Sequence, residues 1–148
     1  MKKTIMVAIA VFMNILMVYS QNYSTAQQKL INGIADFLKT DGYKPENVDD
    51  GLKFTKNGVA YYIEVSNTDT APMYLRLRRY IKYNSELSPE YISEHLNSYN
   101  VKYGVKAICS EKAVILSAEM YLNEKEEFIS IFDVLMLQLE SASSFFDE

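Results

Sequence analysis

The chain has 148 residues, enough for one domain with a substantial hydrophobic core. Its net charge of −4 argues against general binding to nucleic acids or to anionic membranes. The single cysteine, Cys109, excludes an internal disulfide, and we interpret it as a small apolar residue buried on a strand.

The first twenty residues have the pattern of a secretory signal peptide. Lys2 and Lys3 precede an apolar run, and Val18-Tyr19-Ser20 supplies the small residues of a cleavage site. We predict cleavage after Ser20, because Val18 and Ser20 fit the signal peptidase pocket. An uncleaved membrane anchor is the alternative, but the apolar run is shorter than the roughly 20 residues that a membrane-spanning helix needs. Residues 21–148 would then form a single α+β domain without a stable membrane anchor. We expect this domain in the periplasm or outside the cell, with a net charge that changes from −4 to −6 when the two lysines are removed.

Helical spacing of apolar residues predicts a first helix between Ser24 and Thr40. Ser24 and Gln27 form a capping-box pattern at its start. Asp41-Gly42 follows its end, where glycine suits the left-handed conformation that often terminates a helix.

A hairpin is predicted next, because apolar residues recur at every second position from Gly51 and Asn57-Gly58 is a strong turn signal. On the returning strand, 59–65, Tyr61 and Ile63 share one face, whereas Tyr62 and Glu64 share the other.

A third strand is predicted from Met73, with Tyr74, Arg76 and Arg78 on one face. The pair Arg78-Arg79 breaks the alternation and predicts a β-bulge.

The second half of the chain predicts a helix that opens at Ser88-Pro89-Glu90, a second hairpin over 105–122, and a long final helix after Asn123. The expected order is helix, three strands, helix, two strands, helix. This is an α+β fold in which helices cover one face of an antiparallel sheet. Near the end, Phe145 and Phe146 are expected to dock on the domain or on a neighbour.

Together these elements resemble the YbjN-like proteins, which share the fold of the class I type III secretion chaperones. The resemblance covers roughly residues 24–146 and depends on the order of elements, on Leu87-Ser88-Pro89, and on four residues before the first hairpin: Ile34, Phe37, Leu38 and Gly42. It implies a non-enzymatic protein-binding or sensory module that is often dimeric. Cystatin-like and other small α+β sheets remain open alternatives.

Catalytic groups are sparse, and we expect no catalytic residue, cofactor or metal. His95 is the single histidine, so it has no histidine or cysteine cluster to complete a transition-metal site. The sequence contains neither a nucleophile elbow nor a glycine-rich phosphate loop. A hydrolase with paired carboxylates stays as an alternative, because four acidic residues could converge in space: Asp49, Asp50, Glu64 and Glu119.

The most distinctive candidate binding residues of this acidic chain are Tyr74, Arg76 and Arg78 on the third strand, together with Tyr62 on the neighbouring strand. Tyrosine and arginine are enriched where proteins bind other proteins, because they combine rigid contact area with planar donors. The alternative interpretation is an ordinary solvent face whose arginines bridge to acids on adjacent strands.

Our leading hypothesis is an exported, non-enzymatic module that recognises a protein or peptide through its sheet face or a strand edge, as a chaperone-like or sensory protein. A small-molecule-binding periplasmic protein is the first alternative, and the carboxylate hydrolase is the second. We expect that the chain can form a homodimer. We do not expect it to bind nucleic acid.

Overall fold

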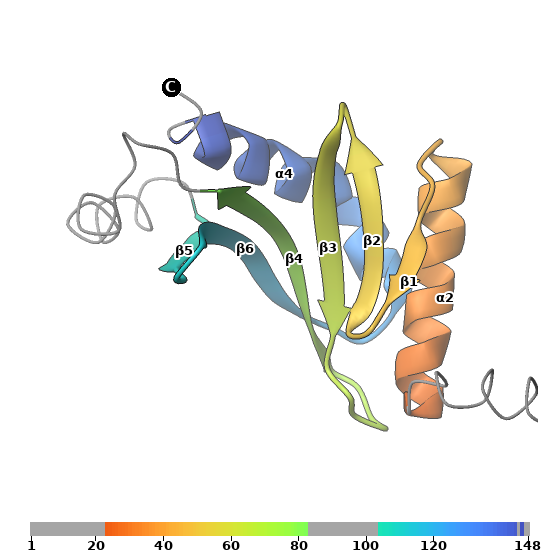
Figure 1. Ribbon diagram of the computed structural model, residues 1–148. Helices are drawn as coiled ribbons and strands as arrows, with labels where there is room; N and C mark the ends of the chain where they lie inside the picture. Colours follow the sequence, from red (N-terminus) through yellow and green to blue (C-terminus); the bar gives the residue numbers. More distant parts are fainter. Residues whose placement is uncertain (1–22, 83–103, 145, 147–148) are drawn as a thin grey trace, which may run out of the picture.

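The computed structural model describes residues 23–82, 104–144 and 146 (Figure 1). Two helices and six strands follow one another in this part of the chain: α2 (Thr25–Thr40), β1 (Glu46–Val48), β2 (Gly51–Lys56), β3 (Val59–Val65), β4 (Met73–Lys82), β5 (Lys106–Cys109), β6 (Ala113–Leu122) and α4 (Lys125–Ser144). The predicted signal peptide, the predicted helix that opens at Ser88, and His95 lie outside the described residues.

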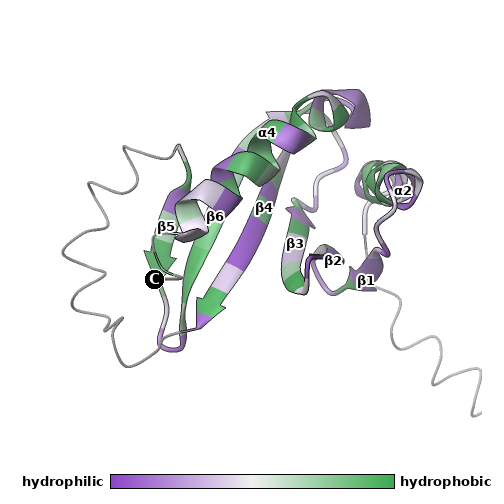
Figure 2. Cartoon of the chain, turned by 90° about the horizontal axis from the view of Figure 1, so that it is seen from above, coloured by the Kyte–Doolittle hydropathy of each residue, from purple (hydrophilic) through white to green (hydrophobic). Residues whose placement is uncertain are grey.

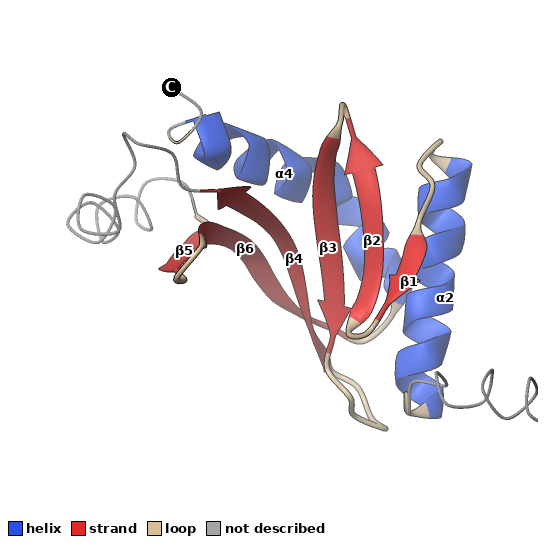
Figure 3. Cartoon of the chain, in the orientation of Figure 1, coloured by secondary structure: helices blue, strands red, loops and turns tan. Residues whose placement is uncertain are grey.

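The six strands form one antiparallel sheet in the order β1-β2-β3-β4-β6-β5. Both described helices lie on the same side of the sheet, as the view from above shows (Figure 2). Figure 3 shows the strands in front of α4, with α2 beside β1. This α+β architecture agrees with the fold class expected from the sequence.

Local signals set the bounds of the first elements. The Ser24 hydroxyl accepts a hydrogen bond from the backbone N–H of Gln27 at 3.1 Å, which caps α2. Gly42, just past the end of this helix, has a φ of 91°. Asn57 and Gly58 have φ values of 52° and 80°, so they form the tight turn with two positive φ angles that joins β2 to β3.

The N-terminal residues of the described chain are tied to two loops at one end of the sheet. The Tyr23 hydroxyl lies 2.8 Å from the carbonyl oxygen of Val48 and 3.0 Å from that of Asp49, in the turn between β1 and β2. Gln27 is buried and donates from Nε2 to the carbonyl oxygen of Val65 at 2.8 Å, at the end of β3. Helix α2 is therefore attached to the sheet by polar contacts as well as by its apolar stripe.

Aromatic rings fill the space between the sheet and the helices. Phe54 stacks on Tyr61 with ring centroids 5.4 Å apart, and Phe132 of α4 lies 6.0 Å from Phe54. Phe37 of α2 meets Phe132 edge-on at 5.3 Å. Tyr61 and Ile63 are 2% and 1% exposed, so they share one face as predicted, and that face is the one packed against the helices.

The predicted β-bulge at Arg78-Arg79 is wrong. Strand β4 pairs with β6 residue by residue from Met73 to Lys82, and Arg79 faces the helices. An arginine is tolerated there because its Nη1 hydrogen-bonds with the Ser143 hydroxyl of α4, and the guanidinium also lies beside the Tyr61 hydroxyl.

Two further details differ from, or add to, the sequence-based expectation. Strand β1 was not predicted, since Glu46-Asn47-Val48 is too short to show alternation. Phe146 is 3% exposed and belongs to the core, so the C-terminal segment docks on its own domain at this residue.

None of the described helices is long and apolar enough to cross a membrane.

We expect Phe54→Ala to lower the free energy of unfolding by about 3–5 kcal/mol, because it removes a ring in contact with both Tyr61 and Phe132. Urea unfolding followed by circular dichroism measures this change. The control is Thr55→Val at the next position, whose exposed side chain points to the opposite face of the sheet, and it should stay within about 0.5 kcal/mol of the wild type. Equal effects of the two substitutions would contradict the assigned register.

Candidate functional site

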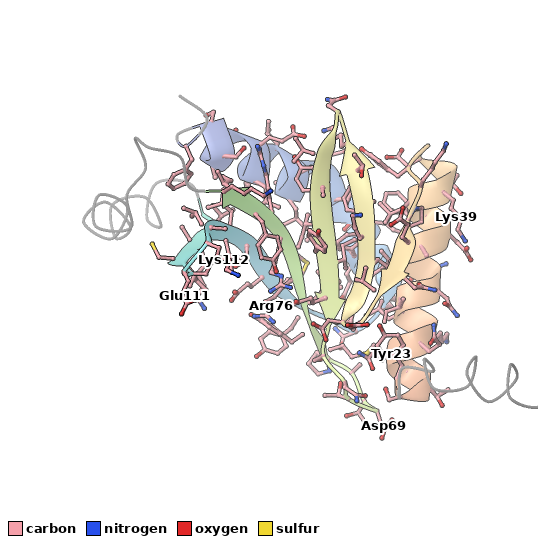
Figure 4. All side chains as sticks on the ribbon, in the orientation of Figure 1. Tyr23, Lys39, Asp69, Arg76, Glu111 and Lys112 are labelled. Atoms are coloured by element: carbon pink, nitrogen blue, oxygen red, sulfur yellow. The ribbon has the colours of Figure 1, made fainter. Side chains whose placement is uncertain are left out.

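All four predicted binding residues lie on the face of the sheet that points away from α2 and α4. Tyr62 is paired with Arg78 across β3 and β4, and Tyr74 is paired with Tyr121 across β4 and β6. Arg76 projects from the middle of this face, whereas α4 lies behind the sheet (Figure 4). We call this surface the Tyr–Arg face and define it by Tyr62, Tyr74, Arg76, Arg78, Tyr80 and Tyr121 with the acids Glu64 and Glu119.

Glu64 is the centre of this face, because both arginines bind it. Nη2 of Arg76 lies 2.5 Å from one carboxylate oxygen of Glu64, and Nη2 of Arg78 forms an ion pair with the other oxygen. The side chain of Glu64 is only 9% exposed and that of Arg78 only 16%, whereas 39% of Arg76 is exposed. Glu64 and Arg78 thus form a nearly buried pair, and Arg76 is the accessible cation of the three groups.

These ion pairs are what the alternative interpretation of the arginines predicted, namely bridges to an acid on the adjacent strand. Two guanidinium groups that share one carboxylate leave at most one net positive charge at this point. Removing Glu64 would leave the nearly buried Arg78 without this partner, which is costly for a buried charge. The shared carboxylate of Glu64 therefore holds both arginines in fixed positions.

The tyrosine rings of the face are arranged in two pairs. Tyr62 meets Tyr80 edge-on with centroids 5.2 Å apart, and Tyr74 lies 5.3 Å from Tyr121. The Arg78 guanidinium lies 5.3 Å from the centroid of the Tyr80 ring, and that of Arg76 lies 6.0 Å from Tyr74. Such cation–π distances add to the ion pairs in fixing each arginine.

A second acid, Glu119, organises the side of the face next to β6. Burial opposes its ionisation, but hydrogen bonds with Tyr74 and Ser117, together with the charges of Lys106 and Arg76, outweigh burial and hold its pKa below that of an ordinary glutamate. Burial, supported by the hydrogen bond to Glu119, raises the pKa of Tyr74 to about 12. At neutral pH Glu119 is therefore ionised and Tyr74 is a neutral donor.

Two hollows lie beside Glu64 on this face, and both are also lined by Asp50. The larger, of about 280 Å³, is bordered by Tyr74 and Arg76. The smaller, of about 210 Å³, is bordered by Tyr62, Arg78 and Tyr80. Because pockets for drug-sized molecules are usually roughly 300–1,000 Å³, these hollows suit individual side chains of a larger partner better than a free ligand.

The sequence predicts Glu64 on the same face as Tyr62, but it does not identify Glu64, Tyr80, Glu119 or Tyr121 as binding residues. Tyr80 shares the alternation of Arg76 and Arg78, so it could have been included had the bulge not been assumed. Glu119 and Tyr121 could not have been assigned, because nothing in the sequence shows that β6 is the strand beside β4.

The acids of the hydrolase hypothesis are only partly brought together. Asp50 and Glu64 border the same hollows, and Glu64 and Glu119 lie on either side of Arg76. Both oxygens of Glu64 face arginines, so this carboxylate acts as a partner in ion pairs. Within residues 23–82, 104–144 and 146, no group of three or more histidine, cysteine or acidic side chains is placed to hold a metal ion.

A separate groove of about 400 Å³ lies on the other side of the sheet, between α2 and the start of α4. Leu30 and Met73 contribute apolar surface to it, and its charges balance, because the two lysines Lys29 and Lys125 are matched by two glutamates, Glu124 and Glu126. The Lys125 side chain lies so close to Gly33 that an added Cβ would come within 2.6 Å of its Cδ. The volume of the groove falls in the range of small-molecule sites.

No protein-family model and no curated protein matches the chain. Among solved structures, the crystal structure of an uncharacterized protein from Methanothermobacter thermautotrophicus is similar, with a TM-score of 0.55 and 11% sequence identity. The match covers 78% of this chain and 95% of the other. At this identity the likeness concerns the fold alone, and the resemblance to YbjN-like proteins stays a prediction from the sequence.

The lowered pKa of Glu119 predicts an acid-dependent contribution to stability. A carboxyl group whose pKa is lower in the folded protein stabilises the fold above its unfolded pKa and loses this effect as the pH falls through the folded pKa. We expect Glu119→Gln to cost about 1 kcal/mol at neutral pH, from the weakened hydrogen bonds, and progressively less below roughly pH 4.5.

Urea unfolding at several pH values, on the wild type and Glu119→Gln, measures this difference. The control Glu111→Gln, on the exposed turn before β6, should follow the wild type at each pH. A cost that stays constant from neutral to acidic pH would show that the ionised form of Glu119 contributes nothing.

Proposed function

We propose that this protein is an exported, non-enzymatic binding module that recognises a protein or peptide through the Tyr–Arg face. The observation that supports it best is the gathering of tyrosines and fixed arginines on the side of the sheet away from the described helices. Tyr80 and Tyr121 are 40% and 69% exposed there. Export to the periplasm or beyond, and a chaperone-like or sensory role, belong to the same proposal and rest on the sequence.

The chemistry of the face favours a polypeptide partner. Its arginines are held by Glu64, so they present donors in fixed positions, and the two arginines with Glu64 carry at most one net positive charge. Exposed tyrosine rings supply broad apolar contact at a low cost in conformational entropy. Side chains of an extended segment that lie two residues apart, and so on one side of it, could fill the two hollows beside Glu64. A homodimer is part of the proposal as well, and this face stays available in it if the subunits meet at a sheet edge.

A peptide library displayed on phage, selected on the purified protein, tests this function. The variant Arg76→Gln/Tyr80→Thr removes the accessible cation and an exposed ring, and it leaves the nearly buried Glu64–Arg78 pair in place. We expect the selected peptides to bind this variant at least about ten times more weakly than the wild type, which corresponds to about 1.4 kcal/mol.

The matched control is Lys39→Gln/Leu137→Thr, which removes one exposed cation and one exposed apolar side chain from the two helices. It should bind the selected peptides as the wild type does. Undiminished binding by Arg76→Gln/Tyr80→Thr would remove the Tyr–Arg face as the recognition surface.

The groove between α2 and α4 favours a second candidate function, binding of a small molecule. A screen for ligands that raise the melting temperature tests it, because a ligand bound only by the folded state stabilises that state. Gly33→Ala would push the Lys125 side chain into a new position, so a ligand in this groove should lose its thermal shift in that variant. A ligand whose shift survives Gly33→Ala but not Arg76→Gln/Tyr80→Thr would instead belong to the Tyr–Arg face.

A further inference from the structure

The two hollows beside Glu64 differ in charge. The smaller one is lined by three acids, Asp49, Asp50 and Glu64, and among the described residues only Arg78 contributes a positive charge to it. Its lining therefore has an excess of two negative charges. The larger hollow is lined by Asp50, Glu64 and Arg76, which gives an excess of one. The smaller hollow is thus the more negative of the two.

The two aspartates are the source of this excess. Both arginines of the face already form ion pairs with Glu64, so they are engaged with another acid. Asp50 is exposed, and it forms no ion pair within the part of the chain that the structure describes. Burial raises the pKa of the nearby Tyr23, and the negative charges of Asp50 and Asp49 raise it further. A positive charge brought to this corner of the sheet is therefore attracted.

Backbone contacts hold the two aspartates in place. The Tyr23 hydroxyl lies 3.0 Å from the carbonyl oxygen of Asp49. The backbone N–H of Val65 donates to the carbonyl oxygen of Asp50 at 3.3 Å. Gly51, the next residue, approaches β3 so closely that an added Cβ would lie 2.1 Å from a carbonyl oxygen of that strand. The turn is thus positioned before any partner binds, which lowers the entropic cost of binding.

Two tyrosine rings also line the smaller hollow. Tyr62 and Tyr80 meet there at an interplanar angle of 87°. Aromatic rings pack well against the methylene groups of lysine and arginine, and the faces of the rings attract the cation at the end of these side chains. A metal ion fits less well, because no three acids of the described residues are placed to hold one together. The lining therefore favours an organic cation, an ammonium or a guanidinium group.

We propose that the smaller hollow binds a lysine or arginine side chain of the polypeptide partner. This inference rests on the proposed function, since it names the residue type that the Tyr–Arg face recognises. Charge complementarity supports it, because the hollow is negative and the whole chain has a net charge of −4, which attracts a basic segment over a longer range.

The larger hollow then receives the side chain two positions away on the same extended segment. Arg76, the accessible cation of the face, borders this hollow, so a side chain with a hydrogen-bond acceptor fits there. The partner segment therefore has a basic residue and an acceptor residue separated by one position. This arrangement also explains why Arg76→Gln/Tyr80→Thr should weaken binding, because it alters the lining of both hollows.

The peptides that the purified protein selects from the phage library provide the first test. We expect lysine or arginine to be enriched at one fixed position relative to the unselected library. A double-mutant cycle then identifies the contact. In the protein, Asp50→Asn removes the charge that borders both hollows and keeps the size of the side chain. In the peptide, glutamine replaces the enriched basic residue.

Asp50→Asn should weaken binding of the original peptide at least about fivefold and leave binding of the glutamine peptide unchanged, because both substitutions remove the same ion pair. Isothermal titration calorimetry measures the four dissociation constants. Asp50 is exposed, so the variant should fold, which circular dichroism checks. The control is Asp133→Asn, which removes the same charge from α4 on the other side of the sheet and should bind both peptides as the wild type does.

Two results would overturn the assignment of a basic residue to this hollow: selected peptides without an enriched lysine or arginine, and an effect of Asp50→Asn that is the same for both peptides. If such peptides still lose binding to Arg76→Gln/Tyr80→Thr, the proposed function stands and only the residue type is wrong. If no peptide is selected, or if binding ignores Arg76→Gln/Tyr80→Thr, the proposed function fails and this inference fails with it.

Discussion

The pairing of β3 with β4 determines which chemistry lies on each side of the sheet. Ile63 is opposite Leu77, and both are buried beneath the helices, while the next pair along the strands is Glu64 opposite Arg76. Side chains alternate along a strand, so a slip of one residue would move the charged groups under α4 and the apolar groups into water. The aromatic core and the Tyr–Arg face are thus two consequences of one register.

Once this register is set, Glu64 limits what the face can do. An exposed pair of arginines would attract anions of many kinds, but here one carboxylate lies between them. The face therefore presents tyrosine rings and guanidinium donors in fixed positions, with little uncompensated charge. This distinguishes it from a phosphate-binding or nucleic-acid-binding surface, in which cations are left unpaired for the ligand.

Features encoded locally could be predicted from the sequence, and features that depend on distant residues could not. The limits of α2 follow from Ser24 and Gly42, and the first hairpin follows from Asn57-Gly58, because these residues act on their immediate neighbours. The four binding residues were placed on one face by alternation alone. Bridges from the arginines to an acid on an adjacent strand were one of the two interpretations, but the identity of that acid as Glu64 depends on the pairing of β3 with β4, which the sequence does not show. Arg79 was misread as a bulge because its partner, Ser143, lies 64 residues further along the chain.

The contacts of Tyr23 have a practical consequence for any recombinant form of this protein. Its hydroxyl holds the turn that carries Asp49 and Asp50, and Asp50 borders both hollows of the face. Only two residues separate Tyr23 from the predicted export cleavage site. An affinity tag fused directly in front of Gln21 would crowd this corner of the domain, so a tag is better placed behind a flexible spacer.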